Sequence, residues 1–340
     1  MVQLLKNSAR AISYTWFEHF DQTPIETPTW PFNQQALQQA TVFWPTEYQW
    51  LPSEGFLEPV RLGIAHWAKV ERRPIPQPYQ GVCLFELLVA GVKHRIAIDY
   101  SDYVDRIERD CLATVSLYFK MQYLKAGYDL SDGECRKVLP GGYVMADRRM
   151  VSKLSQIRGT ARTAPPQFDI YGRFGLEFAT EIRSAVVNVL RGDPSLNYEG
   201  GMRKVPYRQS IRDASRSKIC IDLPGNGDFC FRLFDYLAVG AFIIAYPHRT
   251  MLPVPLVDCY HIVYMKSDLS DLVDLCHYYL VHPDERRAIQ SNAAEYFDSC
   301  CHLTQLGSWY LQQSLNMAIA APLLPADVPL PLHQLRRSAA

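Results

Sequence analysis

Two groups of residues in this sequence have the types and spacing that chemistry on a phosphate-bearing molecule requires. The first is Gly225-Asn226-Gly227-Asp228, followed one helical turn later by Arg232. A glycine loop that enters a helix presents free backbone N–H groups and the positive end of the helix dipole to an anion. The Arg232 guanidinium can donate two hydrogen bonds to phosphate oxygens, so the segment predicts a phosphate-binding site. The alternative interpretation is an arginine that is only solvated.

The second group is a pair of acids, Asp99 and Asp102, which follow the strand-like run Arg95 to Tyr100. Ligands of open α/β sheets bind beyond the carboxyl ends of the strands, so both acids are candidate catalytic residues. We favour Asp102, because Asp99 is expected to be held by hydrogen bonds within the turn. The alternative is that Asp102 only caps the next helix.

Further positions near glycine-rich turns or on the predicted helix are expected to contact the same phosphate-bearing ligand: Gly172, Arg173, Lys204, Lys218 and Asp235. Each of the cations, taken alone, is more often an ordinary surface charge.

The elements that must position these residues can be predicted from the apolar pattern. Ile219 to Leu223 and Ala241 to Tyr246 are short apolar runs bounded by Pro or Gly, which is typical of buried parallel strands. Between them Phe231, Phe234 and Leu237 recur at helical spacing. The succession predicts a right-handed parallel crossover, and alternating strand and helix patterns continue to about residue 320.

The first half of the chain is less regular. Residues 1–80 are rich in Trp and Pro and predict loop-heavy structure, in which the aromatic rings either pin loops to a core or stack on sugars. From residue 81 onwards, strand-like runs predict a second α/β layer. A basic helix and Pro165-Pro166 place the domain boundary near residue 166. We therefore expect domains at 1–165 and 166–320 and a mobile tail at 321–340.

The glycine loop and its surroundings resemble the donor-binding half of GT-B glycosyltransferases. Gly225-Asn226-Gly227, Phe231-Arg232, Asp235-Tyr236-Leu237 and Gly240-Ala241 are similar to a segment of the CAP10-type protein glucosyltransferases and, more loosely, to the exostosin pattern. The family has Ser where this chain has Phe231, and many retaining relatives have Glu where it has Asp228 and Asp235. The resemblance implies an α/β fold with two Rossmann-like domains facing a cleft.

Composition excludes several other classes. Lys plus Arg and Asp plus Glu both number 35, so no basic surface for nucleic acid is indicated. The nine Cys have no CxxC spacing and the N-terminus has no signal-peptide core, which favours a cytoplasmic protein. No apolar run is long enough to span a membrane. The sequence also lacks Asp-x-Asp, a P-loop motif and a complete dinucleotide fingerprint, so neither a metal nor a bound cofactor is expected.

The resemblance implies a glycosyltransferase that uses a nucleoside diphosphate sugar as substrate and a hydroxyl group as acceptor. We expect a metal-independent, inverting reaction, with Asp102 as general base and Arg232 stabilising the departing diphosphate. In a retaining enzyme Asp228 or Asp235 would matter instead. The alternative is a non-catalytic nucleotide- or glycan-binding protein of the same fold. The sugar, the nucleotide, the acceptor and the oligomeric state stay open.

Overall fold

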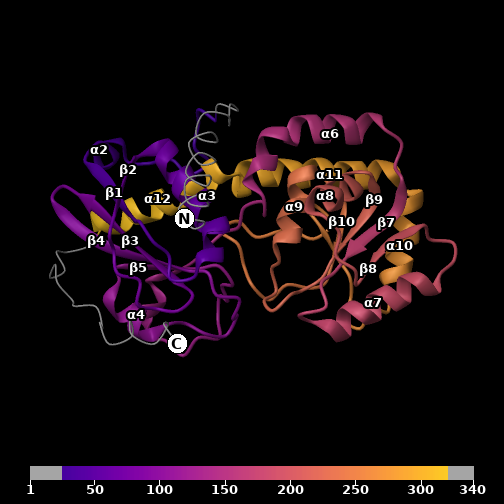
Figure 1. The fold of residues 1–340 in the computed structure, drawn as a ribbon, viewed down its shortest axis with the longest axis horizontal. Helices are drawn as coiled ribbons and strands as arrows, with labels where there is room; N and C mark the ends of the chain where they lie inside the picture. The colour runs from indigo at the N-terminus through magenta and orange to yellow at the C-terminus, as the bar shows by residue number, and fades with distance from the viewer. Residues whose placement is uncertain (1–24, 321–340) are drawn as a thin grey trace, which may run out of the picture.

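The structure, a computed structural model, describes residues 25–320 and consists of two lobes, each built around a β-sheet (Figure 1). One sheet is formed by strands between residues 40 and 140 and the other by strands between residues 168 and 264. No sheet in the described part of the chain crosses residue 166. This arrangement confirms the expected α/β class with two sheet-centred lobes. The predicted tail at 321–340 lies outside the described residues.

The first sheet has six strands in the order β2-β1-β3-β4-β5-β6. Their bounds are Ala40–Pro45 (β1), Lys69–Arg73 (β2), Val82–Val89 (β3), Val92–Asp99 (β4), Leu117–Lys120 (β5) and Val138–Pro140 (β6). Strand β3 runs antiparallel to β1 and β4, whereas the other neighbours are parallel. Ala90 and Gly91 join β3 to β4 with φ angles of 49° and 82°, the left-handed conformation that a tight hairpin requires. The sheet is therefore mixed.

Residues 40–73, part of the segment 1–80 that was expected to be loop-heavy, form a regular unit, so that expectation is wrong for this part. Residues 1–24 of the same segment lie outside the described residues. Helix α3, Glu54–Trp67, connects β1 to the parallel strand β2. Pro59 lies inside this helix, and the surrounding aromatic and proline residues masked its periodicity in the sequence. The other helices of this lobe are α2 (Gln34–Gln38), η1 (Leu51–Ser53), α4 (Arg109–Thr114) and α5 (Asp132–Cys135).

The second sheet has five strands, all parallel to their neighbours, in the order β11-β10-β9-β7-β8. Their bounds are Phe168–Arg173 (β7), Tyr198–Gly201 (β8), Ser217–Asp222 (β9), Ile243–Ala245 (β10) and Val263–Tyr264 (β11). The chain places β8 on one side of β7 and then crosses to β9 on the other side. The carboxyl ends of β7 and β9 are therefore the topological switch point, where doubly wound sheets bind ligands.

Helices cover both faces of the second sheet (Figure 1). Along β9, Ile219 and Ile221 belong to a core that α7 and α10 share, whereas Cys220 joins a core with α8 and α9 on the opposite face. This alternation is what the two-residue period of a strand produces in a doubly wound sheet. The helices are α6 (Leu154–Thr163), α7 (Thr180–Gly192), α8 (Tyr207–Ser215), α9 (Phe231–Val239), α10 (Leu272–Val281) and α11 (Pro283–Tyr296). A 3-10 turn, η2 (Arg148–Lys153), precedes α6.

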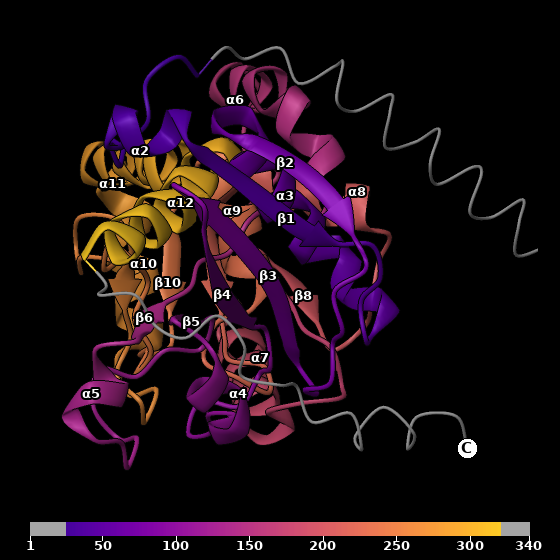
Figure 2. The ribbon, with the colours of Figure 1, turned by 90° about the vertical axis from the view of Figure 1, so that its left-hand side faces the viewer.

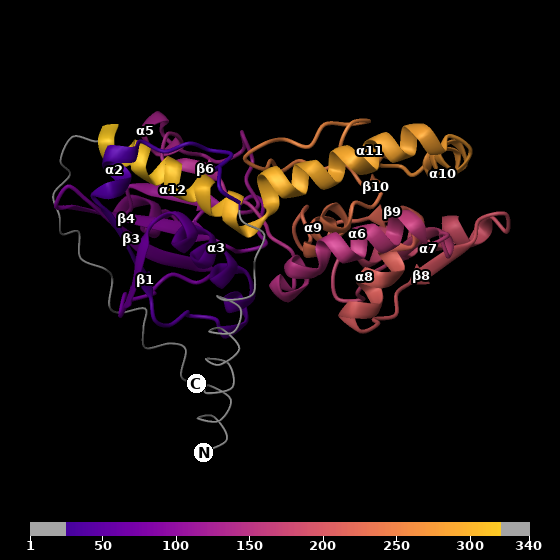
Figure 3. The ribbon, with the colours of Figure 1, turned by 90° about the horizontal axis from the view of Figure 1, so that it is seen from above.

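The last helix, α12 (Leu303–Ala320), returns from the second lobe and lies across the first (Figure 3). A π-helical turn, Phe297–Cys301, joins it to α11. Figure 2 shows α12 beside α2, and it also contacts α3. Gly63 of α3 and Gly307 of α12 allow this contact, because a Cβ built on Gly307 would lie 2.1 Å from the carbonyl carbon of Gly63.

Gly307→Ala is expected to destabilise the protein by about 1–3 kcal/mol or more, because the new methyl group would meet the backbone of α3. Gly55→Ala is the matched control, since a Cβ on this α3 glycine has no heavy atom within 4 Å. The control should raise stability by roughly 0.5–1 kcal/mol through helix propensity. Urea unfolding of both variants measures the difference, and equal effects would show that the helices do not need this glycine contact.

Candidate functional site

The glycine loop enters helix α9 as the sequence predicts. Pro224 to Cys230 connects β9 to α9, and Gly225 closes the loop by donating its N–H to the Gly227 carbonyl at 2.9 Å. No described residue accepts a hydrogen bond from the backbone N–H of Phe231 or Arg232. The start of α9 therefore offers free donors and the positive end of its dipole at the carboxyl edge of the sheet.

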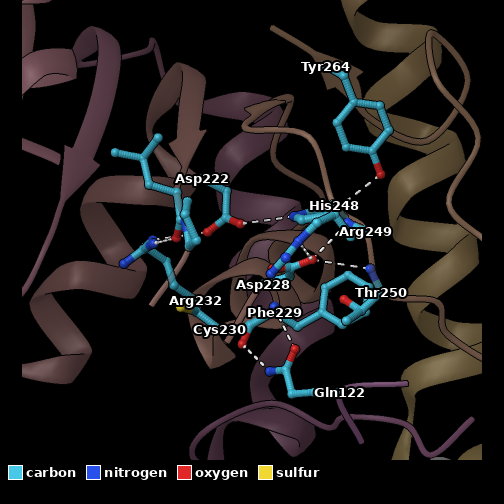
Figure 4. A network of polar contacts seen from close by, with 12 residues as sticks. Gln122, Asp222, Asp228, Phe229, Cys230, Arg232, His248, Arg249, Thr250 and Tyr264 are labelled. Carbon is cyan, nitrogen blue, oxygen red and sulfur yellow. Dashed lines mark hydrogen bonds and ion pairs between the residues drawn. The ribbon is translucent and has the colours of Figure 1, made fainter. Parts of the chain in front are cut away.

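Arg232 projects from α9 onto the buried carboxylate at the end of β9 (Figure 4). Its Nε donates to Asp222 Oδ1 at 3.1 Å, and its Nη2 donates to the Leu223 carbonyl. Burial lowers the pKa of Arg232, but the Asp222 charge outweighs this effect and leaves the pKa above its ordinary value. The third nitrogen, Nη1, has no acceptor within residues 25–320. Arg232 is thus a rigidly held cation rather than a solvated one.

A second arginine, Arg183 of α7, lies at the switch point and was missed by the sequence analysis. It donates to the Gly175 carbonyl after β7 at 2.8 Å and to the Pro224 carbonyl after β9 at 2.7 and 3.0 Å. Burial lowers the pKa of Arg183, and the neighbouring Arg232 lowers it further. Two guanidinium groups therefore share one nearby carboxylate, Asp222, which leaves this end of the sheet positive.

Asp228 anchors the glycine loop to the chain that follows β10. Its carboxylate accepts the backbone N–H groups of Arg249 and Thr250 at 2.7 and 3.2 Å and forms an ion pair with the Arg249 guanidinium at 2.8 Å. The residue is 7% exposed, so its lone pairs are committed to the protein. Asn226 is exposed at the tip of the same loop.

The first lobe holds the glycine loop through Gln122, which is fully buried. Its amide donates to the Phe229 carbonyl at 2.9 Å and accepts the Phe229 N–H at 3.2 Å (Figure 4). At Gly227 the lobes touch, because a Cβ there would lie 2.4 Å from the Gln122 amide nitrogen and 2.8 Å from the Asp102 carbonyl oxygen. The structure therefore brings Asp102 next to the predicted phosphate loop.

The two candidate acids have different surroundings. Asp99 is 2% exposed, forms an ion pair with the fully buried Lys120 at 3.0 Å, and accepts the Ser101 N–H and the Tyr118 hydroxyl. A carboxylate with these partners is a support and has no free lone pair for an acceptor proton. Asp102 is more exposed, yet burial of its carboxyl group raises its pKa, against a lowering by Lys120. A raised pKa suits a general base.

One oxygen in this region is left without a partner. Asp222 is fully buried, and its Oδ2 has no hydrogen-bond donor within the described chain. The His248 ring faces this oxygen: its Nε2 lies 3.8 Å from Asp222 Oδ2, and its Nδ1 is 3.1 Å from the Tyr264 hydroxyl oxygen (Figure 4). The segment after β10, which contains His248, therefore packs against the carboxylate of Asp222.

Other predicted residues are not brought into this group. Lys218 is at the start of β9, on the opposite edge of the sheet, where it pairs with Asp169 at 2.7 Å. Asp235 faces away from the loop and accepts the Tyr207 hydroxyl and the Ala146 N–H at 2.8 and 3.0 Å. Neither residue therefore belongs to the group around the glycine loop.

Three further predicted residues lie at the end of β7 or after β8 but have structural partners. Gly172 is buried within β7, where a Cβ would lie 2.9 Å from the Phe174 ring. Arg173 ends β7 and forms an ion pair with Glu199. Lys204 pairs with Glu177 at 2.7 Å on the surface. Arg173 and Lys204 lie on the carboxyl side of the sheet, so their donor-binding role stays a prediction.

A comparison with known families agrees with the architecture of the second lobe. Residues 148–303 match the model of a family described as glycosyl transferase-like, which spans a little less than half of the 340 residues. This match supports the expected glycosyltransferase class for these residues. The narrower resemblance to CAP10-type and exostosin proteins stays a prediction. No curated protein matches the chain.

Solved structures give distant matches. They include a glycosyltransferase from Rickettsia africae (TM-score 0.42, 11% identity, 60% of this chain) and Anabaena Alr3699/HepE in complex with UDP-glucose (0.37, 11%, 62%). A third is the pneumococcal O-GlcNAc transferase GtfA in complex with UDP and GlcNAc (0.36, 10%, 62%). The chain covers 64%, 65% and 47% of these proteins, respectively. TM-scores this low carry no argument about activity.

The described residues also bear on the expectations about metal ions and membrane-spanning helices. Within residues 25–320, no three His, Cys, Asp or Glu side chains gather as a set of metal ligands. None of the helices there has the length and apolar character that crossing a membrane requires.

Asp235 makes stability depend on pH. Burial raises the pKa of its carboxyl group from an ordinary 3.8 to about 7, although hydrogen bonds from Tyr207 and Ala146 oppose this rise. Between these pH values the folded protein keeps a proton that the unfolded chain has lost, so stability falls as pH rises through this window. For a single proton the free energy of unfolding decreases by about 1.4 kcal/mol for each pH unit in the window.

Asp235→Asn should remove this slope, because the amide carries no charge and its oxygen can accept both hydrogen bonds. Unfolding free energies of the variant and the wild type, measured from about pH 4 to about pH 8, test the expectation. The variant should be the more stable protein at the upper end of this range. Parallel pH profiles would contradict it.

Proposed function

We propose that this protein transfers a sugar from a nucleoside diphosphate donor to a hydroxyl acceptor. The observation that carries the proposal is a juxtaposition at the switch point of the second sheet. There the glycine loop, the free N–H groups of α9 and the cation Arg232 lie together, and Asp102 of the first lobe lies against the same loop. The fold alone would support a binding protein equally well.

The second lobe supplies the site for the diphosphate. The N-terminus of α9 and Arg232 Nη1 are placed to donate hydrogen bonds to phosphate oxygens, and Arg183 adds positive charge behind the loop. Because these groups are already held by Asp222, Leu223 and Pro224, they need no reorganisation as negative charge develops on the leaving diphosphate. This electrostatic stabilisation supports the expected metal-independent reaction.

The first lobe supplies the base for an inverting transfer. As the acceptor oxygen bonds to the anomeric carbon, the bond from that carbon to the diphosphate oxygen breaks and the diphosphate leaves with the electron pair. The acceptor proton passes to Asp102, whose raised pKa favours this role. Asp99 has no part in the proton transfer and only supports the loop through Lys120 and Ser101.

The acceptor is assigned to the aromatic surface beside Asp102. Trp50 is 54% exposed and stacks on Tyr100, two residues before Asp102, with ring centroids 6.4 Å apart. Phe56 contacts Phe231 across the lobes at 5.5 Å. A flat aromatic face near the base suits the apolar face of a sugar or another cyclic acceptor.

All nine cysteines are free thiols, which supports the cytoplasmic setting.

The proposal is tested by incubating the protein with uridine and guanosine diphosphate sugars and measuring nucleoside diphosphate release. A transferase should release nucleotide slowly by hydrolysis and faster with an acceptor glycan. Nucleotide binding without release, over a panel of donors and acceptors, would support the alternative of a non-catalytic binder.

Arg232→Lys is expected to lower kcat/KM by about 10- to 100-fold, which corresponds to the roughly 1.5–3 kcal/mol of a charged hydrogen bond. Lysine keeps the charge opposite Asp222 but loses the planar fork. Arg232→Ala is a poorer test, because an unpaired buried Asp222 would destabilise the fold by about 3–5 kcal/mol.

Arg61→Lys is the matched control for this substitution. Arg61 is 9% exposed and pairs with Glu58 of the same helix at 2.9 Å in the first lobe. The control should keep full activity. Equal kcat/KM values for Arg232→Lys and the wild type would show that Arg232 has only a structural role.

Asp102→Asn should reduce transfer by at least about 100-fold while leaving nucleotide affinity nearly unchanged, because only the proton acceptor is lost. Its counterpart Asp132→Asn removes an exposed carboxylate at the start of α5 and should have no effect. Single-turnover rates and nucleotide titrations separate the two quantities. Full activity in Asp102→Asn, together with inactivity in Asp228→Asn, would overturn both the base and the inverting mechanism.

A further inference from the structure

The second lobe has a cavity of about 450 Å³ at the amino edge of its sheet, opposite the edge that carries Arg232. It is bordered by α6, by the start of β9, by the turn after α9 and by α11. Six cationic side chains and no acid are among its lining residues: Arg158, Arg162, Arg216, Lys218, Arg286 and Arg287. We call it the amino-edge pocket. Its volume is within the range of small-ligand sites.

Only part of this charge is neutralised. Three of the cations have acidic partners from outside the lining: Arg158 with Asp298, Lys218 with Asp169, and Arg287 with Asp284. Within the described chain, Arg162, Arg216 and Arg286 have no ion pair. Arg162 is exposed at the rim, on the last turn of α6.

Two of the unpaired arginines are built into the pocket wall. Arg286 is 9% exposed and uses only Nη1, in a hydrogen bond to the Tyr279 carbonyl. Burial lowers its pKa, and the like charge of Arg287 lowers it further. The Nε of Arg216 is buried and has no acceptor in the described chain. No hydrogen-bond acceptor or carboxylate in the described chain therefore offsets the charge of this guanidinium at its Nε.

Helix dipoles do not account for the surplus of charge. Helices α6, α8 and α9 end near this edge, and Arg158 donates to the Ala238 carbonyl at the end of α9 at 2.7 Å. Each helix end contributes about half a negative charge. Three such ends fall well short of three unpaired guanidinium groups, so the pocket stays positive.

We infer that the amino-edge pocket is a second anion site, which binds a ligand carrying two or more phosphate groups. Each guanidinium group can donate two parallel hydrogen bonds to phosphate oxygens, and Arg162, Arg216 and Arg286, which have no ion pair in the described chain, line one cavity. The same chemistry is offered by a free oligophosphate and by a phosphorylated lipid headgroup. The inference does not depend on the proposed transferase activity, since the pocket and the glycine loop lie at opposite edges of the sheet.

Inorganic pyrophosphate is the first probe. Because it can also bind at the glycine loop, the readout is local: hydrogen exchange of the α6 and α11 backbones with increasing pyrophosphate. Protection of both helices is expected. Arg216→Glu and, separately, Arg162→Glu should each raise the pyrophosphate concentration that gives half-maximal protection at least tenfold. Arg136→Glu is the control, because it reverses one exposed charge in the first lobe.

Vesicles of phosphatidylcholine with and without phosphatidylinositol bisphosphate form the second arm. Protection of α6 and α11 by pyrophosphate but not by these vesicles supports a free oligophosphate, and protection by vesicles that contain phosphatidylinositol bisphosphate supports a lipid headgroup. Protection by neither probe overturns the inference. So does protection that Arg162→Glu and Arg216→Glu leave unchanged, or that Arg136→Glu weakens equally. Loss of sugar transfer without loss of this protection would affect only the proposed function.

Discussion

The hydrogen bonds between Gln122 and Phe229 are the contact on which the arrangement of the site depends. A fully buried amide of the first lobe satisfies both backbone groups of a residue that lies between the glycine loop and α9. Each buried backbone group would cost about 1–3 kcal/mol if left unpaired, so the loop is fixed to the first lobe rather than only near it. Gly227 can then approach Asp102 because it has no side chain.

The positive charge at the switch point arises because two arginines, Arg232 and Arg183, lie near a single carboxylate of the second lobe, Asp222. Asp222 alone balances Arg232, while Arg183 uses its donors on the carbonyls after β7 and β9. Arg183 joins the ends of β7 and β9 by donating hydrogen bonds to the carbonyl groups that follow them. A ligand can bind there without displacing this arginine. Anything bound there meets a surface that is already positive and already rigid, which is the condition for electrostatic stabilisation of a developing anion.

The sequence predicts the second lobe better than the first, for physical reasons. Its strands are buried on both faces, so Ile219 to Leu223 and Ala241 to Tyr246 stand out as apolar runs. In the first lobe, Pro59 obscures the helical pattern of the β-α-β unit, and the sheet is mixed rather than all parallel. The site shows the same contrast: the glycine loop has a local pattern, whereas Arg183 and Gln122 act through long-range contacts that no spacing reveals.

Asp99 is held by hydrogen bonds, as the sequence analysis expected, and it supports the backbone that carries Asp102. Asp99 and Lys120 form an ion pair with almost no exposure, and such a pair offsets its desolvation only when further hydrogen bonds complete it. Ser101 and Tyr118 supply those bonds at 2.7 and 2.6 Å. The network therefore fixes the backbone immediately before Asp102. Asp99 therefore holds the loop in place, and the backbone of Asp102, three residues further on, lies next to the glycine loop of the other lobe.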